Sequence, residues 1–165
     1  MPKESQTLIH PIDPIFREDS RILILGSFPS LLSRQNQFYY GNPQNRFWKV
    51  LAAVLHCKLP QTNEEKRDLL LSNKVALWDV IASCRISGSA DSSIADVVPN
   101  DFSKILSCAQ IGKILLNGKT AERLFYKYNP NVKIPAVPLP STSPANAAWT
   151  LERLIFAWRE GFGNF

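Results

Sequence analysis

The sequence contains few of the side chains that bind metals or form disulfides: it has three cysteines and two histidines among 165 residues. The cysteines, Cys57, Cys84 and Cys108, are odd in number and widely spaced, which is typical of reduced thiols inside a cell. Because only His10 and His56 add to them, the ligands for a zinc or iron–sulfur site are too few. We therefore expect no disulfide framework, no metal and no cofactor.

Long hydrophobic runs are also missing. No apolar stretch approaches the ~18 residues that span a bilayer, and the first residues lack the roughly 7–15-residue apolar centre of a signal peptide. These absences predict a cytoplasmic protein without a membrane partner. Repeats, low-complexity tracts and blocks of like charge are absent too, so we expect an N-terminal arm over residues 1–20 and a single domain over residues 21–165.

The composition is that of a packed domain. Hydrophobic residues make up 45% of the sequence and charged residues 20%, and the length suits one domain of about 150 residues. Nineteen basic residues against fourteen acidic ones leave a net charge of +5. This excess favours polyanions such as nucleic acid, although lysines that only promote solubility produce the same balance.

Short apolar runs alternate with helical patterns along the domain. The run at 21–25 ends in Gly26 and predicts a buried strand that leads into a tight turn. A helix is predicted from Arg46, with Asn45 as its cap, because apolar residues recur there every three or four positions. The other predicted elements are helices at 64–71 with Asn63 as cap, from near Phe102, at 120–128 and at 151–162, strands at 75–81, 111–116 and 134–139, and a surface loop at 83–93.

Strands that alternate with helices predict an α/β fold of three layers, in which helices cover both faces of a mostly parallel sheet. Pro135 and Pro138 place the last strand partly at an edge. Ligands of such folds bind at the carboxyl ends of the strands. Three polar loops, at 26–45, 117–120 and 139–146, follow predicted strands, so we expect them to meet there.

The first loop carries three adjacent aromatic residues, Phe38, Tyr39 and Tyr40. A loop has no regular face on which to bury all three, so at least one ring is expected at the surface. An exposed ring suits a heterocyclic base, which stacks on aromatic side chains. The alternative is that these rings fasten the loop to the core.

The other two loops carry groups that suit phosphate. Three hydroxyls lie between two prolines at 139–146, and hydroxyls commonly contact phosphate. The alternative is a turn in which Ser143 caps the following helix and Pro144 is its first residue. Lys119 lies where a strand passes into a helix N-terminus, which favours anions, although simple capping explains this pattern as well.

A serine hydrolase is the main competing enzyme class. Ser27 or Ser141 as nucleophile needs a histidine base within hydrogen-bond reach. His10 lies in the predicted arm and His56 follows the apolar stripe of a helix, so neither is expected beside a serine. Metal-dependent hydrolysis lacks clustered ligands.

Three segments resemble the uracil-DNA glycosylase superfamily: ILGSFPS at 24–30, FYYGNPQNRFWKVL at 38–51 and LPSTSPAN at 139–146. The segment NPQNRFWKV is similar to an element of mismatch-specific uracil/thymine-DNA glycosylases. GSFPS, ALWDVIASC with GSADSSI, and LPSTSPAN look more like the hypoxanthine-DNA (DNA-deoxyinosine) glycosylase branch. The matches run in the same order from Arg21 to Trp158.

The resemblance implies a four-stranded parallel sheet, a base flipped into a pocket, and hydrolysis of the N-glycosidic bond without a metal. It assigns catalysis to Asn45, whose amide oxygen would hold the attacking water, and base stacking to Tyr40. The expected base-binding residues are Gly26, Ser27, Phe28, Tyr40 and Asn117. The expected DNA-binding residues are Ser30, Ser33, Lys119, Ser141, Thr142, Ser143, Pro144 and Asn146.

Several positions depart from the family pattern. Phe28 stands where mismatch-specific enzymes carry an asparagine, Ser30 where glycine is usual, Asn42 where histidine is usual, and Gln44 where the hypoxanthine branch commonly carries arginine. The expected function is a monomeric DNA repair glycosylase that acts on double-stranded DNA with a deaminated or mismatched base, hypoxanthine first, and associates with the nucleoid. The alternatives are a uracil or G·T mismatch glycosylase and an inactive module that binds lesions.

Overall fold

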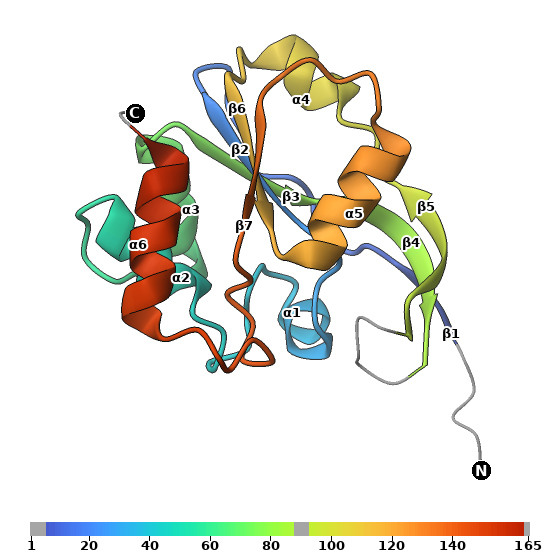
Figure 1. Cartoon of the computed structure of the whole chain (residues 1–165), viewed down its shortest axis with the longest axis horizontal. Coiled ribbons are helices and arrows are strands. Elements are labelled where there is room, and N and C mark those ends of the chain that lie inside the picture. Colours follow the sequence, from blue (N-terminus) through green and yellow to red (C-terminus); the bar gives the residue numbers. More distant parts are fainter. Residues whose placement is uncertain (1–5, 88–92, 164–165) are drawn as a thin grey trace.

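The central sheet of the protein is four-stranded and parallel throughout. The computed structural model describes residues 6–87 and 93–163, and its sheet has the order β3-β2-β6-β7 (Figure 1). The strands are β2 (Ile22–Gly26), β3 (Val75–Asp79), β6 (Lys113–Asn117) and β7 (Ala136–Leu139). Each neighbouring pair is parallel, and β7 lies at an edge as its prolines predict.

Helices cover both faces of this sheet, so the predicted three-layer α/β arrangement is confirmed. Helices α2 (Phe47–Val54), α3 (Asn63–Ser72) and α6 (Leu151–Phe162) pack on one face, and α4 (Ser103–Cys108) and α5 (Lys119–Tyr128) on the other (Figure 1). Strand β2 is buried along its whole length. Its side chains alternate, with Ile22 and Ile24 in the first core and Leu23 and Leu25 in the second.

A second, antiparallel sheet was not expected from the sequence. It has the order β1-β4-β5, formed by β1 (Gln6–Ile9), β4 (Ile81–Ile86) and β5 (Ala95–Pro99). The prediction of a loop at 83–93 is therefore wrong for residues 83–86, while residues 88–92 lie outside the described residues. Cys84 and Ile86 are buried at alternate positions, a strand pattern hidden among polar neighbours.

The N-terminal segment is packed against the rest of the chain. Strand β1 pairs with β4, and Ile15 forms a bridge with Leu77 on β3 through two backbone hydrogen bonds of 3.0 and 2.9 Å. Ile12 and Ile15 are buried in the core. Within the segment that the sequence suggested as an arm, residues 6–9 therefore pair with the antiparallel sheet and Ile15 with the parallel one.

The helix starts show where local signals were misread. Helix α3 is capped by Thr62 in a capping box with Glu65, and the hydrogen bonds from the backbone of Gln61 and Thr62 lower the pKa of Glu65. Helix α6 is capped by Thr150, so the alternative in which Ser143 caps it and Pro144 is its first residue is wrong. A short helix, α1 (Leu31–Asn36), lies within the first polar loop, with Ser30 as its cap. Within residues 6–87 and 93–163, no helix is long and apolar enough to cross a membrane.

Candidate active site at the carboxyl ends of the strands

The three polar loops meet at the carboxyl end of the parallel sheet, as the fold rule predicts. Asn117 is the last residue of β6, and its Oδ1 accepts a hydrogen bond of 3.1 Å from the backbone N–H of Thr142, which follows β7. The Arg46 N–H donates to the Thr142 carbonyl oxygen at 3.1 Å, which ties the start of α2 to the same turn. These contacts close a compact polar cluster around Asn117.

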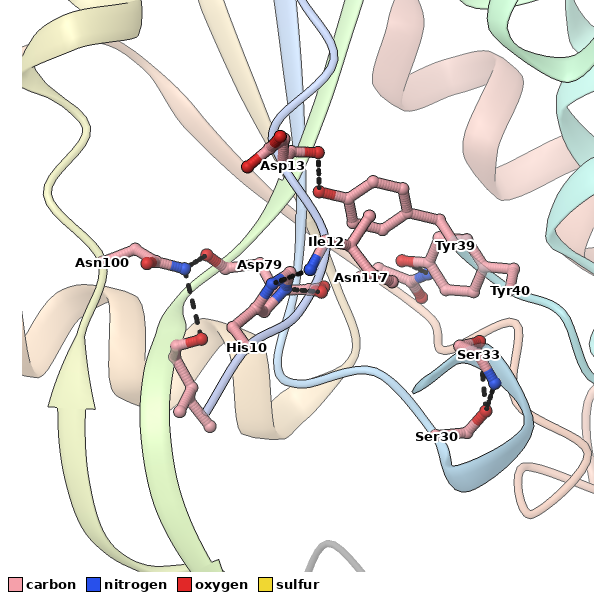
Figure 2. Close-up of polar contacts among 11 residues, drawn as sticks. His10, Ile12, Asp13, Ser30, Ser33, Tyr39, Tyr40, Asp79, Asn100 and Asn117 are labelled. Carbon is pink, nitrogen blue, oxygen red and sulfur yellow. Dashed lines mark hydrogen bonds and ion pairs between the residues drawn. The ribbon is translucent and has the colours of Figure 1, made fainter. Parts of the chain in front are cut away.

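Four side chains form one continuous hydrogen-bonded network. Asn117 Nδ2 donates to the Tyr40 hydroxyl oxygen at 3.0 Å and to Thr142 Oγ1 at 3.1 Å (Figure 2 shows Asn117 and Tyr40). Thr142 Oγ1 in turn donates to Asn45 Oδ1 at 2.9 Å. Thr142 is fully buried, so this network is shielded from water at its centre. The predicted catalytic residue is thus connected to two predicted base-binding residues.

The orientation of the Asn45 amide is fixed by the backbone. Asn45 Oδ1 accepts a hydrogen bond of 2.9 Å from the Phe47 N–H, which only the oxygen end of the amide can do. Together with the Thr142 hydroxyl, Oδ1 therefore accepts two hydrogen bonds. Both lone pairs of Asn45 Oδ1 are therefore occupied. A water that binds this oxygen has to displace the Thr142 hydroxyl from one of them.

The three adjacent rings of the first loop serve different purposes. Tyr39 is buried, its hydroxyl donates to the Asp13 carbonyl oxygen at 2.8 Å, and burial raises the pKa of that hydroxyl. Phe38 is half-buried and packs against Trp48. Tyr40 is half-buried and stacks on Phe47, with the ring centroids 3.9 Å apart. A base that stacks on Tyr40 would therefore use the face opposite Phe47.

Gly26 lies where the first turn leaves β2, and its lack of a side chain is required there. A Cβ at this position would lie 2.5 Å from Asp79 Oδ1 and 2.8 Å from the Tyr40 hydroxyl. The Gly26 carbonyl accepts from Val80 N–H at 2.8 Å. The turn is thereby held between β3 and the Tyr40 side chain, which places Ser27 and Phe28, both half-buried, next to it.

A buried histidine–aspartate pair lies on the other side of this turn, and sequence reasoning missed it. His10 Nε2 donates to Asp79 Oδ2 at 2.8 Å, and the two side chains are only 4% and 5% exposed (Figure 2). The Ile12 N–H donates to His10 Nδ1 at 3.2 Å, which identifies the neutral tautomer with its proton on Nε2. Phe28 packs edge-on against the imidazole at 5.7 Å.

His10 is therefore close to the site although the sequence placed it in an arm. Both of its ring nitrogens are engaged, so it does not act as the base of Ser27 or Ser141. His56 is exposed after the end of α2. Within the described ranges, 6–87 and 93–163, no cluster of three His, Cys, Asp or Glu side chains suits a metal ion.

Arg46 holds the turn at 141–149, a function that the sequence analysis did not assign. Its guanidinium donates to the carbonyl oxygens of Ser143 at 3.0 Å and Asn146 at 3.1 Å, and also to that of Trp149. Arg46 precedes α2 directly, next to Asn45. The sequence signal for this function is the position of Arg46 beside the predicted catalytic asparagine. Its hydrogen-bond partners could not be inferred from the sequence, because they lie about 100 positions away.

The remaining predicted DNA-binding residues are not equally accessible. Ser30 and Pro144 are exposed, as is Lys119 at the start of α5, and Ser141, Ser143 and Asn146 are half-buried. Ser141, Ser143 and Asn146 also hold their own turn through side-chain hydrogen bonds. Ser33 is buried, with its hydroxyl accepting from the Gly41 N–H at 2.9 Å. Ser33 and Thr142 are therefore placed as anchors of the loops.

The structure is thus a three-layer α/β fold in which a glycine turn, an aromatic–asparagine segment and a serine–proline turn lie together at the strand ends, where ligands of such folds bind. The model of the uracil DNA glycosylase superfamily matches residues 14–160, and the chain belongs to this superfamily of DNA glycosylases, which hydrolyse N-glycosyl bonds.

Similar proteins agree with this family. The chain is 36% identical over 144 residues to the hypoxanthine DNA glycosylase of Methanosarcina acetivorans, covering 84% of this chain and 89% of the relative. It is 37% identical over 108 residues to that of Methanosarcina barkeri, covering 64% and 68%. A solution NMR structure from M. acetivorans, described as a candidate uracil DNA glycosylase, superimposes with a TM-score of 0.79 at 30% identity, covering 94% of this chain and all of that one.

Proposed function

We propose that this protein is a hypoxanthine DNA glycosylase that removes the deaminated base from deoxyinosine in double-stranded DNA. The observation that carries the proposal is the network from Tyr40 through Asn117 and Thr142 to Asn45 at the carboxyl ends of the strands. Two relatives named hypoxanthine DNA glycosylases support the choice of base. The enzyme acts as a monomer and uses neither a metal nor a cofactor.

The proposed reaction begins when the damaged nucleotide is rotated out of the duplex. The C1′–N bond then breaks, its electron pair leaves with the base, and positive charge develops on the sugar, as in other glycoside hydrolyses. A water oxygen bonds to C1′, and the proton released by this water neutralises the departing base. Asn45 orients the water through Oδ1, from which the water displaces the Thr142 hydroxyl. Because an amide does not titrate, the rate arises from positioning and not from general-base strength.

The base is held between the first turn and the network. Asn117 donates both of its Nδ2 protons, and its Oδ1 accepts one hydrogen bond from the Thr142 N–H. The second lone pair of Oδ1 is therefore the acceptor that Asn117 offers to a base. It suits an N–H donor on the base edge. Hypoxanthine and uracil both carry such a donor beside a carbonyl, so Asn117 recognises deaminated bases in general. Tyr40, Gly26, Ser27 and Phe28 then supply the stacking surface and the shape of the pocket.

Phosphate contacts position the duplex over this pocket. Lys119 and Ser30 are exposed in the loops at 117–120 and 26–45, and Ser141, Ser143, Pro144 and Asn146 belong to the turn after β7. Such contacts supply affinity without reading sequence. Ser33 and Thr142 contribute to DNA binding indirectly, because they hold the loops that carry these groups.

A panel of duplexes with inosine, uracil, xanthine or a G·T mismatch, assayed for free base, tests the proposal. We expect hypoxanthine to be released fastest. Faster release of uracil, or of thymine from G·T, would assign the protein to the corresponding alternative specificity. Binding of all lesions with no released base would instead support an inactive lesion-binding module, an alternative raised by Phe28 in the first turn.

Two variants test the assignment of Asn45. We expect Asn45→Ala to lower kcat about 100-fold, because the water loses its orienting group. Asn45→Asp keeps an oxygen acceptor and is expected to retain at least tenfold more activity than Asn45→Ala. Equal activities of the two variants would show that the amide oxygen does not hold the water. Melting temperatures measured in parallel separate this effect from the loss of the hydrogen bond to Phe47 N–H.

A further inference from the structure

Arg34 on helix α1 carries a guanidinium that no other part of the described chain satisfies. The residue is half-buried, and its Nε atom is buried without a hydrogen-bond partner. Within residues 6–87 and 93–163, the guanidinium forms neither a hydrogen bond nor an ion pair. Arg46 Nε is also unpaired, but the terminal nitrogens of Arg46 donate to three backbone carbonyls. A buried donor without an acceptor lowers stability, and such a group in a native protein is a candidate for function.

This guanidinium is held at the turn that leaves strand β2. It lies over the Phe28 ring, 5.8 Å from the ring centroid. Phe28 is two residues after Gly26, where a Cβ would lie 2.8 Å from the Tyr40 hydroxyl. The neighbour of the arginine on α1, Ser33, accepts a hydrogen bond of 2.9 Å from the N–H of Gly41, which follows Tyr40. Helix α1 is therefore tied to both segments that border the proposed base pocket.

The charge of the guanidinium is not compensated by the site. The loops at 26–46, 117–120 and 139–149 contain no aspartate or glutamate, although the chain has 14 of them. The Asp79 carboxylate at the end of β3 accepts a hydrogen bond of 2.8 Å from His10. A ligand that offers electron-rich acceptors is therefore favoured beside the arginine.

The setting of Arg34 suits a base better than a phosphate. Lys119 is exposed, as a contact to the DNA backbone requires. Arg34 is recessed instead, and a guanidinium that is stacked on a ring keeps a planar fork of donors at a fixed orientation. Such a fork matches two neighbouring acceptors on the edge of a heterocycle.

Hypoxanthine and uracil differ in one feature that such a fork detects. The free lone pair of Asn117 Oδ1 does not distinguish them, because both bases carry an N–H donor beside a carbonyl. Beyond that carbonyl, hypoxanthine has the ring nitrogen N7, whereas uracil has a C–H group. The O6 and N7 atoms of hypoxanthine thus form the same pair of acceptors that arginine recognises in guanine.

We propose that Arg34 determines specificity by donating two hydrogen bonds to O6 and N7 of the flipped hypoxanthine. The proposal rests on the proposed function, since it presumes a base in the pocket beside Asn117. When the C1′–N bond breaks, the electron pair that leaves with the base spreads over the purine ring, and the guanidinium stabilises this charge. Xanthine carries the same two acceptors and is accepted by the same contact.

Binding to duplexes that resist cleavage tests the contact without requiring base release. The probes carry 2′-fluoro-2′-deoxyinosine, its 7-deaza counterpart, in which a C–H group replaces N7, or a tetrahydrofuran abasic analogue. We expect the wild type to bind the 7-deaza duplex about tenfold more weakly than the inosine duplex, as expected for a lost base contact. Arg34→Met keeps a long side chain over Phe28 and should bind these two duplexes equally. On the abasic duplex, which presents no base, its affinity should be within about twofold of the wild type.

Two further variants serve as controls. Arg67→Met removes an exposed arginine from α3, which contributes no residue to the site, and should keep the tenfold preference. Arg34→Lys keeps the charge but lacks the fork of donors, so it should lose the preference. A wild type that binds both inosine duplexes equally would overturn the proposal, and this comparison needs no variant. Equal losses by Arg34→Met on the inosine and abasic duplexes would also overturn it, because they indicate a phosphate contact.

Base release separates this proposal from the proposed function. We expect Arg34→Met to lower kcat/KM on duplex deoxyinosine about tenfold or more. If the wild type releases no base from any duplex but binds inosine through N7, the proposed function fails and the assignment of Arg34 stands. If the wild type releases hypoxanthine and Arg34→Met releases it equally fast, the assignment of Arg34 is wrong and the proposed function stands.

Discussion

Two polar clusters flank Gly26, and they differ in chemistry. On one side, Tyr40, Asn117, Thr142 and Asn45 form a network of amides and hydroxyls. On the other, Asp79 carries a buried carboxylate whose partner is the neutral imidazole of His10. Gly26 lies between the two, because a Cβ there would approach both Asp79 Oδ1 and the Tyr40 hydroxyl within 3 Å.

This difference in chemistry indicates that the two clusters have different functions. The network consists of loop residues at the strand ends, and its amides and aliphatic hydroxyl keep their protonation state as pH changes, which suits positioning of water and base. The pair joins residues 69 positions apart, and it fixes the N-terminal segment to the end of β3. We therefore expect damage to the pair to reduce mainly stability, and damage to the network to reduce mainly activity.

The largest effect on stability is expected from His10→Leu. This change leaves the Asp79 carboxylate buried without its donor, at a cost of roughly 3 kcal/mol in the free energy of unfolding. Adding Asp79→Asn removes the unpaired charge and should recover at least half of that loss. Urea unfolding of the single and double variants measures both values. His56→Asn, at an exposed histidine whose φ of 55° asparagine also tolerates, is the control and should change stability by less than ~0.5 kcal/mol.

A His10→Leu variant as stable as the wild type would mean that Asp79 finds other partners or water. A double variant less stable than His10→Leu would show that the carboxylate itself stabilises the turn beside Gly26. Either result would contradict the division between a structural pair and a catalytic network.

The same contrast explains what could be predicted from the sequence. The loops that carry Asn117, Thr142 and Asn45 were predicted to meet because the ends of parallel strands meet by the rule of the fold, and the resemblance to uracil-DNA glycosylases then assigned catalysis to Asn45. No comparable sequence pattern indicates that His10 and Asp79 are in contact. Their contact depends on β1 pairing with β4, and neither strand has the regular alternation that would have predicted it.

Tertiary packing also decided details that local patterns left open. Ser33 and Ser30 are alike in the sequence, but the fold of α1 buries the first and exposes the second. Tyr39 and Tyr40 are neighbours, yet one enters the core and the other stacks on Phe47. A loop sequence does not specify which side of it faces the core, so these roles required the structure.

Gly26→Ala tests whether the two clusters depend on one another. The new methyl group would overlap Asp79 Oδ1 and the Tyr40 hydroxyl, so both have to move. We expect a loss of about 2 kcal/mol in stability and about tenfold in kcat/KM, measured by urea unfolding and base release. Gly112→Ala is the control, since the nearest atom to its added Cβ is a carbonyl oxygen at 4.0 Å. If Gly26→Ala changes stability alone, with kcat/KM intact, the turn does not shape the pocket.

The smallest effect is expected inside the network, from Thr142→Val. Valine keeps the volume of threonine but removes the hydroxyl that accepts from Asn117 and donates to Asn45. The fully buried site cannot supply water to replace it, so we expect a loss of about 1 kcal/mol in stability. The Asn117 amide also loses one of the acceptors that hold it beside the base, and kcat should fall about fivefold, which corresponds to a similar free energy. Thr142→Ser retains the hydroxyl and should keep both values near the wild type. If instead Thr142→Val raised kcat, release of the Asn45 Oδ1 lone pair to the attacking water would outweigh the loss of order at Asn117, and the hydroxyl would not be needed to position the base.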